Sequence, residues 1–435
     1  MYALTTNKWL RVITLCVLYF SQGFPWGFMT TALISFLASE GLTMVQSGQL
    51  TAMAYLPWTF KLFWGPLIDS FTYIKMGRRR PWILFAQIGM VMTLVMILFM
   101  GDISANIVLL GWMFFSHNCF ASLQDVSCDA LAVDILLPEE QGKVNGAMWG
   151  AKVIGTGLGA GLMGTILVVK GLVYAIILQT LIMLIIILFP LIILERPNES
   201  RFPWSRKKKN ISKNGKRVKN PFQVFKTLLN AFSKKPSFYG GVFILSAAIN
   251  QGINSGVLPV YYNKNFGWEP DLFSQVMGGP AMVLEFLAAL LGGFLADKFG
   301  RRRIFYFGWG SFSILSGMLG VMIILYQDVP YWFQMGYLVL YPSLVAIGTV
   351  SMFALTMALS WSSASATMFT SYMALSNLSV VIGTNLIGPL TSILEIGHLY
   401  LFMMIIGLAP GVLLKKMNPK AILQLKNERR LIKPL

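Results

Sequence analysis

Charged residues, histidine and cysteine are scarce in this sequence, and each scarcity excludes a class of protein. Only 12% of the 435 residues are charged, against about 25% in an ordinary soluble protein, so no soluble catalytic domain is expected. Two histidines and three cysteines are too few for a histidine-rich metal site or a disulfide framework. No Ser-Lys dyad or paired catalytic aspartate motif stands out either. We therefore predict no enzyme activity, no metal and no cofactor.

Apolar residues fill most of the chain. They make up 56% of it and gather in runs of around twenty residues or more, each long enough to cross ~30 Å of hydrocarbon. We expect an all-α integral membrane protein with twelve transmembrane helices in two pseudo-symmetric six-helix bundles. The expected helices cover residues 11–38, 44–68, 82–101, 105–134, 143–169, 171–194, 237–262, 272–296, 304–326, 331–359, 367–394 and 396–416.

Lysine and arginine lie almost entirely between the apolar runs. The net charge is +18, and an even number of crossings places the basic segments on one side of the membrane. The positive-inside rule makes that side the cytoplasm, so we expect both termini inside. Contact with anionic lipid headgroups explains the basic segment 195–236 better than nucleic-acid binding does.

This basic segment divides the chain. We predict an N-terminal six-helix half over residues 1–194, a cytoplasmic linker over 195–236, a C-terminal six-helix half over 237–416 and a cytoplasmic tail over 417–435. We expect the chain to work as a monomer in membrane lipid.

A Gly…Asp…Gly-Arg-Arg-Arg pattern occurs once in each half, after the second and the eighth expected helices. The glycine before each aspartate is expected to allow close backbone approach, and the arginines to bind carboxylates, with Asp134 as an available partner, or lipid phosphates. Because internal repeats are typical of transporters, the duplication favours this class. The two cytoplasmic gate loops contain Gly65, Asp69, Gly77, Arg78, Arg79 and Arg80, and Gly293, Asp297, Gly300, Arg301 and Arg302.

The second copy resembles the signature loop of the major facilitator superfamily, because it reads Gly-Phe-Leu-Ala-Asp-Lys-Phe-Gly-Arg-Arg-Arg over residues 293–303. The first copy departs from this signature, with Ser70 in place of a basic residue and four extra residues before Gly77. Residues 56–69, 77–82 and 121–130 resemble the AmpG muropeptide permeases and the related acetyl-coenzyme A transporters. That branch also resembles certain siderophore importers.

Five ionisable residues lie inside expected membrane helices, where charge is costly and a functional role is the default expectation. Lys61, Asp125 and Lys152 all lie ~12–14 Å from the cytoplasmic helix ends, so Lys61 or Lys152 is expected to neutralise Asp125. Asp129 shares a helix face with Asp125, and Glu285 is expected deeper. We predict proton coupling by Asp125, Glu285 and Asp129. A permanent Lys–Asp pair that only holds helices together is the alternative.

Polar side chains complete the predicted substrate cavity. Each alone is also compatible with an interhelix hydrogen bond, and the two lysines are equally compatible with binding an anionic cargo. The predicted cavity residues are Lys61, Lys152, Gln22, Asn118, Gln124, Asn250, Gln251, Asn254, Tyr372 and Asn377.

Four glycines of the fifth expected helix form overlapping G-x-x-x-G pairs, Gly155 with Gly159 and Gly157 with Gly161. The same stretch matches a dinucleotide-binding pattern, but it has no preceding strand and lies within an expected membrane helix. The glycine spacing therefore predicts close helix packing.

We predict a proton symporter that imports a polar, anionic solute by alternating access, with protons, a small-molecule solute and membrane lipid as its partners. The resemblance implies the major facilitator fold, a bacterial inner membrane and anhydro-muropeptide as cargo. A siderophore is the runner-up cargo and a coenzyme A derivative the third. An uncoupled channel or a membrane receptor is the alternative from a different class.

Overall fold

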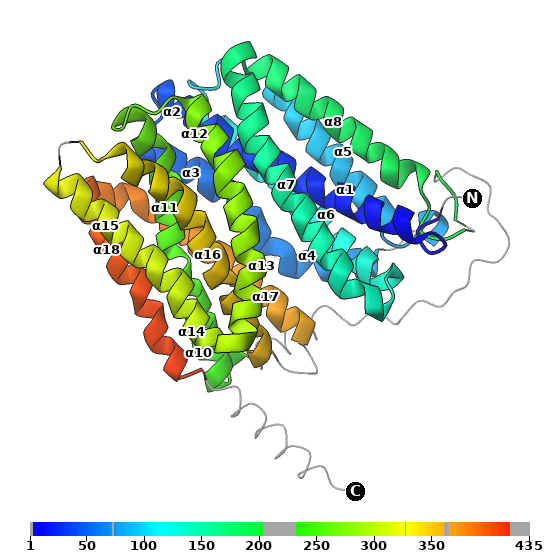
Figure 1. The fold of residues 1–435 in the computed structure, drawn as a ribbon. Coiled ribbons are helices and arrows are strands. Elements are labelled where there is room, and N and C mark those ends of the chain that lie inside the picture. The colour runs from blue at the N-terminus through cyan, green and yellow to red at the C-terminus, as the bar shows by residue number, and fades with distance from the viewer. Residues whose placement is uncertain are drawn as a thin grey trace, which may run out of the picture. The chain divides into compact units, whose positions relative to one another are not determined.

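The computed structural model describes residues 3–71, 74–197, 199–202, 232–326, 328–360 and 365–417. Within these ranges the chain is almost entirely helical (Figure 1), and its only extended pairing is a single bridge between Ala3 and Leu194. The predicted all-α class is confirmed. Most of the predicted basic linker and nearly all of the predicted tail lie outside the described residues.

The helices up to the linker follow the expected order along the chain (Figure 1). They are α1 (Lys8–Gly27), η1 (Phe28–Ala32), α2 (Leu33–Ser39), α3 (Met44–Tyr55), η2 (Leu56–Phe60), α4 (Lys61–Ser70), η3 (Ile74–Met76), α5 (Arg80–Ile97), α6 (Ile107–Ile135), α7 (Pro138–Lys170) and α8 (Leu172–Ile192).

The helices after the linker also keep the expected order. They are α10 (Lys235–Ala247), α11 (Ile249–Lys264), α12 (Pro270–Val276), η4 (Met277–Ala281), α13 (Met282–Phe299), α14 (Arg301–Phe305), η5 (Tyr306–Gly310), α15 (Ser311–Leu325), α16 (Tyr331–Leu359), α17 (Ser365–Thr391), α18 (Ile396–Leu408) and η6 (Ala409–Lys415).

Eleven helical segments of the described chain are long and apolar enough to cross a membrane, and each coincides with a predicted crossing. The remaining prediction, over residues 44–68, falls on a helical stretch that a 3-10 turn over Leu56–Phe60 divides into α3 and α4. Pro57 lies at the start of this turn and has no N–H group for an α-helical hydrogen bond. The turn places Lys61 at the first residue of α4.

The chain divides into two compact units. The first is Met1–Val218 with Pro259–Met282, and the second is Lys219–Leu258 with Val283–Leu435. Residues 259–282, which include the end of α11, α12 and η4, belong to the first unit, where α12 and η4 pack against α7. The two six-helix halves stay a prediction.

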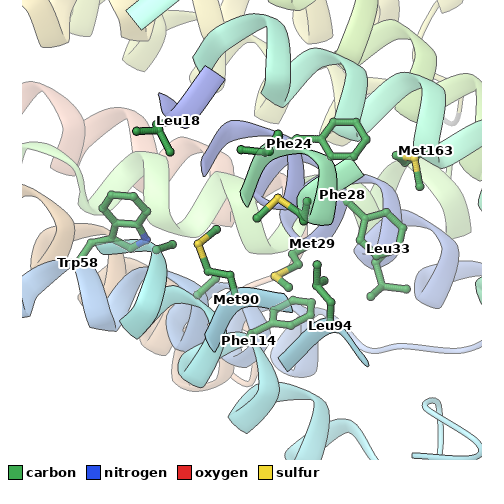
Figure 2. Close-up of a cluster of buried hydrophobic side chains, with 14 of the residues drawn as sticks. Leu18, Phe24, Phe28, Met29, Leu33, Trp58, Met90, Leu94, Phe114 and Met163 are labelled. Carbon is green, nitrogen blue, oxygen red and sulfur yellow. The ribbon is translucent and has the colours of Figure 1, made fainter. Parts of the chain in front are cut away.

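The apolar core of the first unit forms where α1 and η1 meet α5 and α6. Figure 2 shows Phe24, Phe28 and Met29 from the first helical run in one cluster with Met90 of α5 and Phe114 of α6. None of these five side chains is more than 1% exposed. The core therefore fixes α1 against α6, the helix that carries Asp125.

Glycine allows α1 and α7 to run side by side (Figure 1). A Cβ atom added at Gly159 would lie 2.0 Å from the Phe24 carbonyl oxygen, and one added at Gly155 would lie 2.6 Å from the Phe20 carbonyl oxygen. One added at Gly157 would lie 2.7 Å from the carbonyl oxygen of Gly278 in η4. The close packing predicted from the G-x-x-x-G pairs is thus confirmed, on two neighbours at once.

The second unit packs α15 beside α18 and η5 against α16. Trp309 of η5 is 1% exposed, and a Cβ atom added at Gly348 of α16 would lie 2.3 Å from the Trp309 ring. This contact also depends on the absence of a side chain at one position.

Candidate functional site

Three ionisable side chains from three helices meet inside the first unit, and we call them the charged cluster: Lys61 of α4, Asp125 of α6 and Lys152 of α7. The ammonium group of Lys61 forms an ion pair with Asp125, and the Nζ atom of Lys152 lies 3.7 Å from Asp125 Oδ1. The side chains of Asp125 and Lys61 are 4% and 9% exposed. One carboxylate faces two ammonium groups, so the fully ionised cluster has an excess of one positive charge.

Tryptophan rings flank the charged cluster. The centroid of the Trp58 ring lies 4.9 Å from Lys61 Nζ and 4.5 Å from Lys152 Nζ, within the range of cation–π attraction. The Trp58 indole N–H donates to Asn118 Oδ1 at 3.0 Å, so this predicted cavity residue also lies at the cluster. The Trp58 indole partly replaces the hydration that the two ammonium groups lose on burial.

Asp129 lies one helical turn beyond Asp125 on α6. Its carboxylate accepts a hydrogen bond from the Tyr19 hydroxyl of α1 and forms no ion pair with any residue that the structure describes. Asp129 is exposed, whereas Asp125 is buried. The two predicted proton carriers on this face therefore have different surroundings.

Two of the three predicted cavity glutamines lie in the first unit, and both are buried in its packing. The amide of Gln124 donates to the Leu18 carbonyl oxygen at 2.7 Å and accepts from Gln87 of α5 at 2.9 Å, so it joins three helices. Gln22 of α1 is 2% exposed, and its amide makes no hydrogen bond with the described residues.

The predicted cavity residues of the second unit are also largely committed to helix contacts. Asn250 donates to a serine of α15 at 3.4 Å, Asn254 accepts from a tyrosine of α16 at 2.8 Å, and Tyr372 donates to a carbonyl of α10 at 3.2 Å. All three are fully buried. Gln251 of α11 and Asn377 of α17 are half-buried.

Glu285 of α13 is the acidic group that the sequence places deepest in the second half. It is half-buried, and it makes no ion pair or hydrogen bond with another residue in the described part of the chain. An unpaired carboxylate in an apolar helix is costly when ionised. Such a group is chemically suited to carry a proton.

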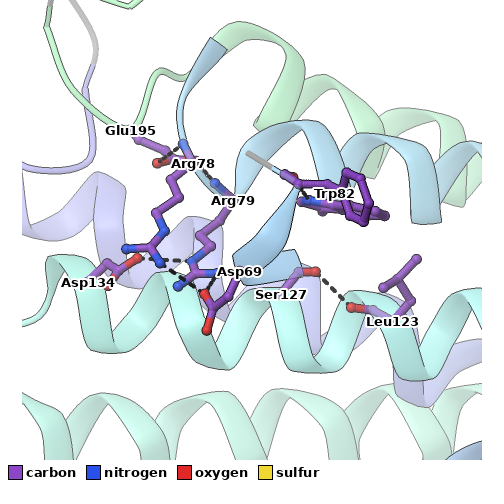
Figure 3. A network of polar contacts seen from close by, with 9 residues as sticks. Asp69, Arg78, Arg79, Trp82, Leu123, Ser127, Asp134 and Glu195 are labelled. Carbon is purple, nitrogen blue, oxygen red and sulfur yellow. Dashed lines mark hydrogen bonds and ion pairs between the residues drawn. The ribbon is translucent and has the colours of Figure 1, made fainter. Parts of the chain in front are cut away.

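The first gate loop joins α4, α5 and α6 through charge (Figure 3). Asp69 accepts hydrogen bonds from Arg78 at 3.0 Å and from Arg79 at 2.7 Å. Arg79 also donates to Asp134 at 3.0 Å, the partner expected from the sequence. Gly77 has a φ of +103°, and a Cβ atom there would lie 2.6 Å from the Glu195 carboxylate, so the loop requires glycine at this position.

Arg80 differs from its two neighbours because, among the described residues, its side chain binds only backbone. Its five N–H groups donate to the carbonyl oxygens of Met76, Pro190, Leu191, Ser200 and Arg201. Two of these carbonyls belong to the last turn of α8, where helix carbonyls have no partner within the helix. Arg80 is 2% exposed and does not reach lipid phosphates.

Glu195 occupies the N-terminal end of α5. Its carboxylate accepts from the backbone N–H groups of Arg78 and Arg79 at 2.9 and 2.7 Å, as expected for an anion at the positive end of a helix. Glu199 lies beside it, outside the membrane-spanning segments. Burial, together with the neighbouring Glu195 carboxylate, raises the pKa of Glu199 to about 7.

The second gate loop makes fewer contacts. Arg301 donates to the Ala354 carbonyl oxygen at 2.8 Å and Arg302 to that of Met417 at 2.6 Å. Asp297 is exposed and forms no ion pair within the described residues. Gly300, with a φ of +95°, provides the turn that the pattern predicts.

One expectation about both loops is wrong. The glycines before the aspartates were expected to allow close backbone approach, but a Cβ atom added at Gly65 would meet nothing within 4 Å, and one at Gly293 would meet only a valine methyl group at 3.9 Å. The close approaches in the first unit are made instead by glycines of α1, α7 and η4. A repeated glycine in a motif does not reveal its packing, which depends on neighbours that the motif does not contain.

A family model described as Major Facilitator Superfamily matches residues 15–384 and, in a second match, residues 240–434. The chain belongs to the Major Facilitator Superfamily. It is a multi-pass membrane transporter, and the membership implied by the resemblance is confirmed.

Relatives within the superfamily match a limited part of the chain. The anhydromuropeptide permease of Escherichia coli K12 is 34% identical over 138 residues, which are 30% of this chain and 26% of the permease. An uncharacterized protein of Haemophilus influenzae is 28% identical over 149 residues, or 33% of each chain. The chain thus matches about a quarter to a third of the length of these relatives.

Solved structures of other transporters share the fold across nearly the whole chain. A crystal structure of the nucleoside transporter NupG aligns with a TM-score of 0.66 and 12% identity, covering 94% of this chain and 99% of that one. A POT family transporter in complex with a thioalcohol-conjugated peptide aligns with a TM-score of 0.67 and 14% identity, covering 94% and 96%. At these identities the likeness shows the fold alone.

Three aromatic residues of the site were not among the residues predicted from the sequence: Trp58, Trp149 and Tyr19. Trp58 precedes Lys61 by three residues and Trp149 precedes Lys152 by three, a spacing that places each pair on one helix face. That spacing was a usable signal. Tyr19 could not be found this way, because its contact with Asp129 is set by how α1 packs on α6.

Proposed function

We propose that this superfamily member is a proton symporter that imports a polar, anionic, muropeptide-like solute by alternating access. The observation that carries the proposal is the charged cluster, in which one buried carboxylate faces two ammonium groups. Protonation of Asp125 would remove its negative charge and leave two unpaired ammonium groups. An anionic solute then binds more strongly, so the proton and the solute travel together.

Glu285 and Asp129 are the further proton carriers in this proposal. Glu285 is supported by its lack of a charged partner among the described residues, and Asp129 by its exposure next to Asp125. A transporter that alternates between two faces needs groups that load a proton on one side and release it on the other. The three carboxylates provide candidates in both predicted halves.

The first gate loop has a separate part in the proposal. Asp69, Arg78, Arg79 and Asp134 tie the ends of α4, α5 and α6 together, which suits a latch at the cytoplasmic end. We propose that this latch holds one conformation and does not touch the cargo. We further propose the arrangement expected from the sequence, with two six-helix halves in a monomer, both termini cytoplasmic, in a bacterial inner membrane.

The cargo class is supported by the relative from E. coli, whose name is anhydromuropeptide permease. The matched stretch is 30% of this chain. A siderophore importer of the same fold remains the alternative that the motifs allow.

The test is uptake of radiolabelled anhydro-muropeptide by proteoliposomes that contain the purified chain, with an acidic outside pH. We expect accumulation above the equilibrium level, and we expect a protonophore to abolish it. An excess of unlabelled ferric siderophore or acetyl-coenzyme A in parallel samples separates the cargo classes, because only a true cargo competes. Accumulation that ignores the pH gradient would rule out symport.

A further inference from the structure

The two lysines of the charged cluster are not equivalent. Lys61 is 9% exposed and forms the close ion pair with Asp125. Lys152 is 17% exposed, and its Nζ atom approaches Asp125 no closer than 3.7 Å, beyond hydrogen-bond distance. This long ion pair uses at most part of the donor capacity of the Lys152 ammonium group. The ammonium group therefore keeps unused donors in a mostly buried place.

Trp149 adds an open aromatic surface next to this ammonium group. It lies one turn before Lys152 on α7, and its ring centroid is 5.3 Å from Lys152 Nζ. The same Nζ atom lies 4.5 Å from the Trp58 ring centroid, so the Trp149 ring is on the side of α7 that faces the charged cluster. Trp149 is 59% exposed, whereas Trp58 is 6% exposed.

We infer that Lys152 and Trp149 form a subsite for a sugar-like ring that carries an anionic group. The ammonium group of Lys152 binds a carboxylate or phosphate through charge-assisted hydrogen bonds, and the apolar face of the ring packs on the exposed indole of Trp149. Lys61 holds Asp125, and Lys152 holds the solute. The inference rests on the proposed function, because it assumes that the solute reaches the charged cluster.

The different roles of Lys61 and Lys152 follow from the charges in the cluster. Asp125 neutralises one of the two ammonium groups, and Asp129, the other carboxylate near both lysines, forms no ion pair with either of them within the described residues. One positive charge therefore lacks a directly paired counter-ion, which is costly in a mostly buried site. An anionic group on Lys152 removes that excess and leaves the ion pair of Lys61 intact. A neutral ring offers only the stacking contact on Trp149.

The test is isothermal titration of the full chain in detergent with three sugars. N-acetylmuramic acid and N-acetylglucosamine differ by one carboxylate-bearing lactyl group, and N-acetylglucosamine 6-phosphate provides the phosphate arm. We expect the unchanged chain to bind at least one anionic sugar about 10- to 100-fold more tightly than the neutral one, as for one hydrogen bond to a charged group. The sugar that binds more tightly shows whether the subsite takes a carboxylate or a phosphate.

Two variants with matched controls assign the residues. Lys152→Met should abolish the preference for the anionic sugar, and Trp149→Leu should weaken all three sugars by similar factors. Lys170→Met, on the exposed last residue of the same helix, and Trp112→Leu, at a half-exposed tryptophan of α6, should bind like the unchanged chain. Thermal denaturation of each variant shows that it is folded.

A preference that survives Lys152→Met overturns the inference, and so does a chain that binds none of the three sugars. The uptake assay separates this failure from that of the proposed function. If gradient-driven uptake persists while Lys152→Met keeps the sugar preference, the subsite is wrong and the symporter stands. If the preference for the anionic sugar depends on Lys152 but uptake does not depend on the pH gradient, the subsite is supported and proton coupling is wrong.

Discussion

The three consecutive arginines of the first gate loop have three different roles. The Arg78 side chain is 31% exposed and pairs with Asp69 alone among the described residues. The Arg79 side chain is 6% exposed and bridges Asp69 to Asp134, and the Arg80 side chain is buried against backbone carbonyls. A sequence motif treats them as one feature. Their contributions to stability should therefore differ.

Arg80→Lys should destabilise the chain more than Arg78→Lys. The ammonium group of lysine cannot reach carbonyls on several sides as a planar guanidinium does, so at least one buried carbonyl loses a charged partner, at a cost of about 1.5–3 kcal/mol. The exposed Arg78 pair should be worth about 1 kcal/mol or less. Chemical denaturation in detergent measures both, and equal losses would contradict the assigned roles.

Glu199 should make stability depend on pH. Its pKa is raised from the ordinary 4.5 to about 7, so the stabilising effect of the protonated form is complete below about pH 4.5 and disappears as the pH rises through 7. Between these values the unfolded chain releases a proton that the folded chain keeps. Glu199→Gln should therefore lower the dependence of the melting temperature on pH between 5 and 8, without moving it at the acidic end. An unchanged pH profile would contradict the burial of this carboxylate.

At the scale of helices, glycine decides where α1 and α7 can touch. A Cβ atom at Gly159 would lie 2.0 Å from a backbone oxygen, whereas one at Gly146 of the same helix would meet nothing within 4 Å. Alanine favours a helix over glycine by about 1 kcal/mol. The same Gly→Ala substitution is therefore expected to change stability in opposite directions at the two positions.

Gly146→Ala should leave the melting temperature unchanged or raise it. Gly159→Ala should lower the melting temperature, because overpacking costs about 1–3 kcal/mol of unfolding free energy. Thermal denaturation of the two purified variants compares them directly. If Gly159→Ala were as stable as Gly146→Ala, the close crossing of α1 and α7 would be wrong.

The sequence predicted the position of most helices because a run of about twenty apolar residues can satisfy its backbone hydrogen bonds within a membrane by forming a helix. It did not predict the 3-10 turn over Leu56–Phe60 or the π-helical turns over Phe28–Ala32, Met277–Ala281 and Tyr306–Gly310. These turns leave the average hydropathy unchanged. Pro57 and Pro280 lie within two of them and Pro25 lies just before a third, but the turn over Tyr306–Gly310 contains no proline. Composition therefore does not predict where the helices change their hydrogen bonding.

At the scale of the whole molecule, counting residues from helix ends placed Lys61, Asp125 and Lys152 at one depth, because the rise of a helix is fixed. The direction in which each of these side chains points, and the presence of the Trp58 ring beside both lysines, depend on how the helices pack. The same limit explains the polar residues that pack helices together, such as Gln124 and Asn254. A polar residue in an apolar helix signals an interaction but does not tell a ligand from a neighbouring helix.

Proton coupling by the intramembrane carboxylates can be tested by comparing two transport modes in proteoliposomes that contain Asp125→Asn, Glu285→Gln or the unchanged chain. Solute exchange at equal pH on both sides needs no net proton movement, whereas accumulation driven by a pH gradient does. We expect at least one of the two variants to keep exchange and lose gradient-driven accumulation. Full accumulation by both variants would contradict the claim that these intramembrane carboxylates couple protons to transport.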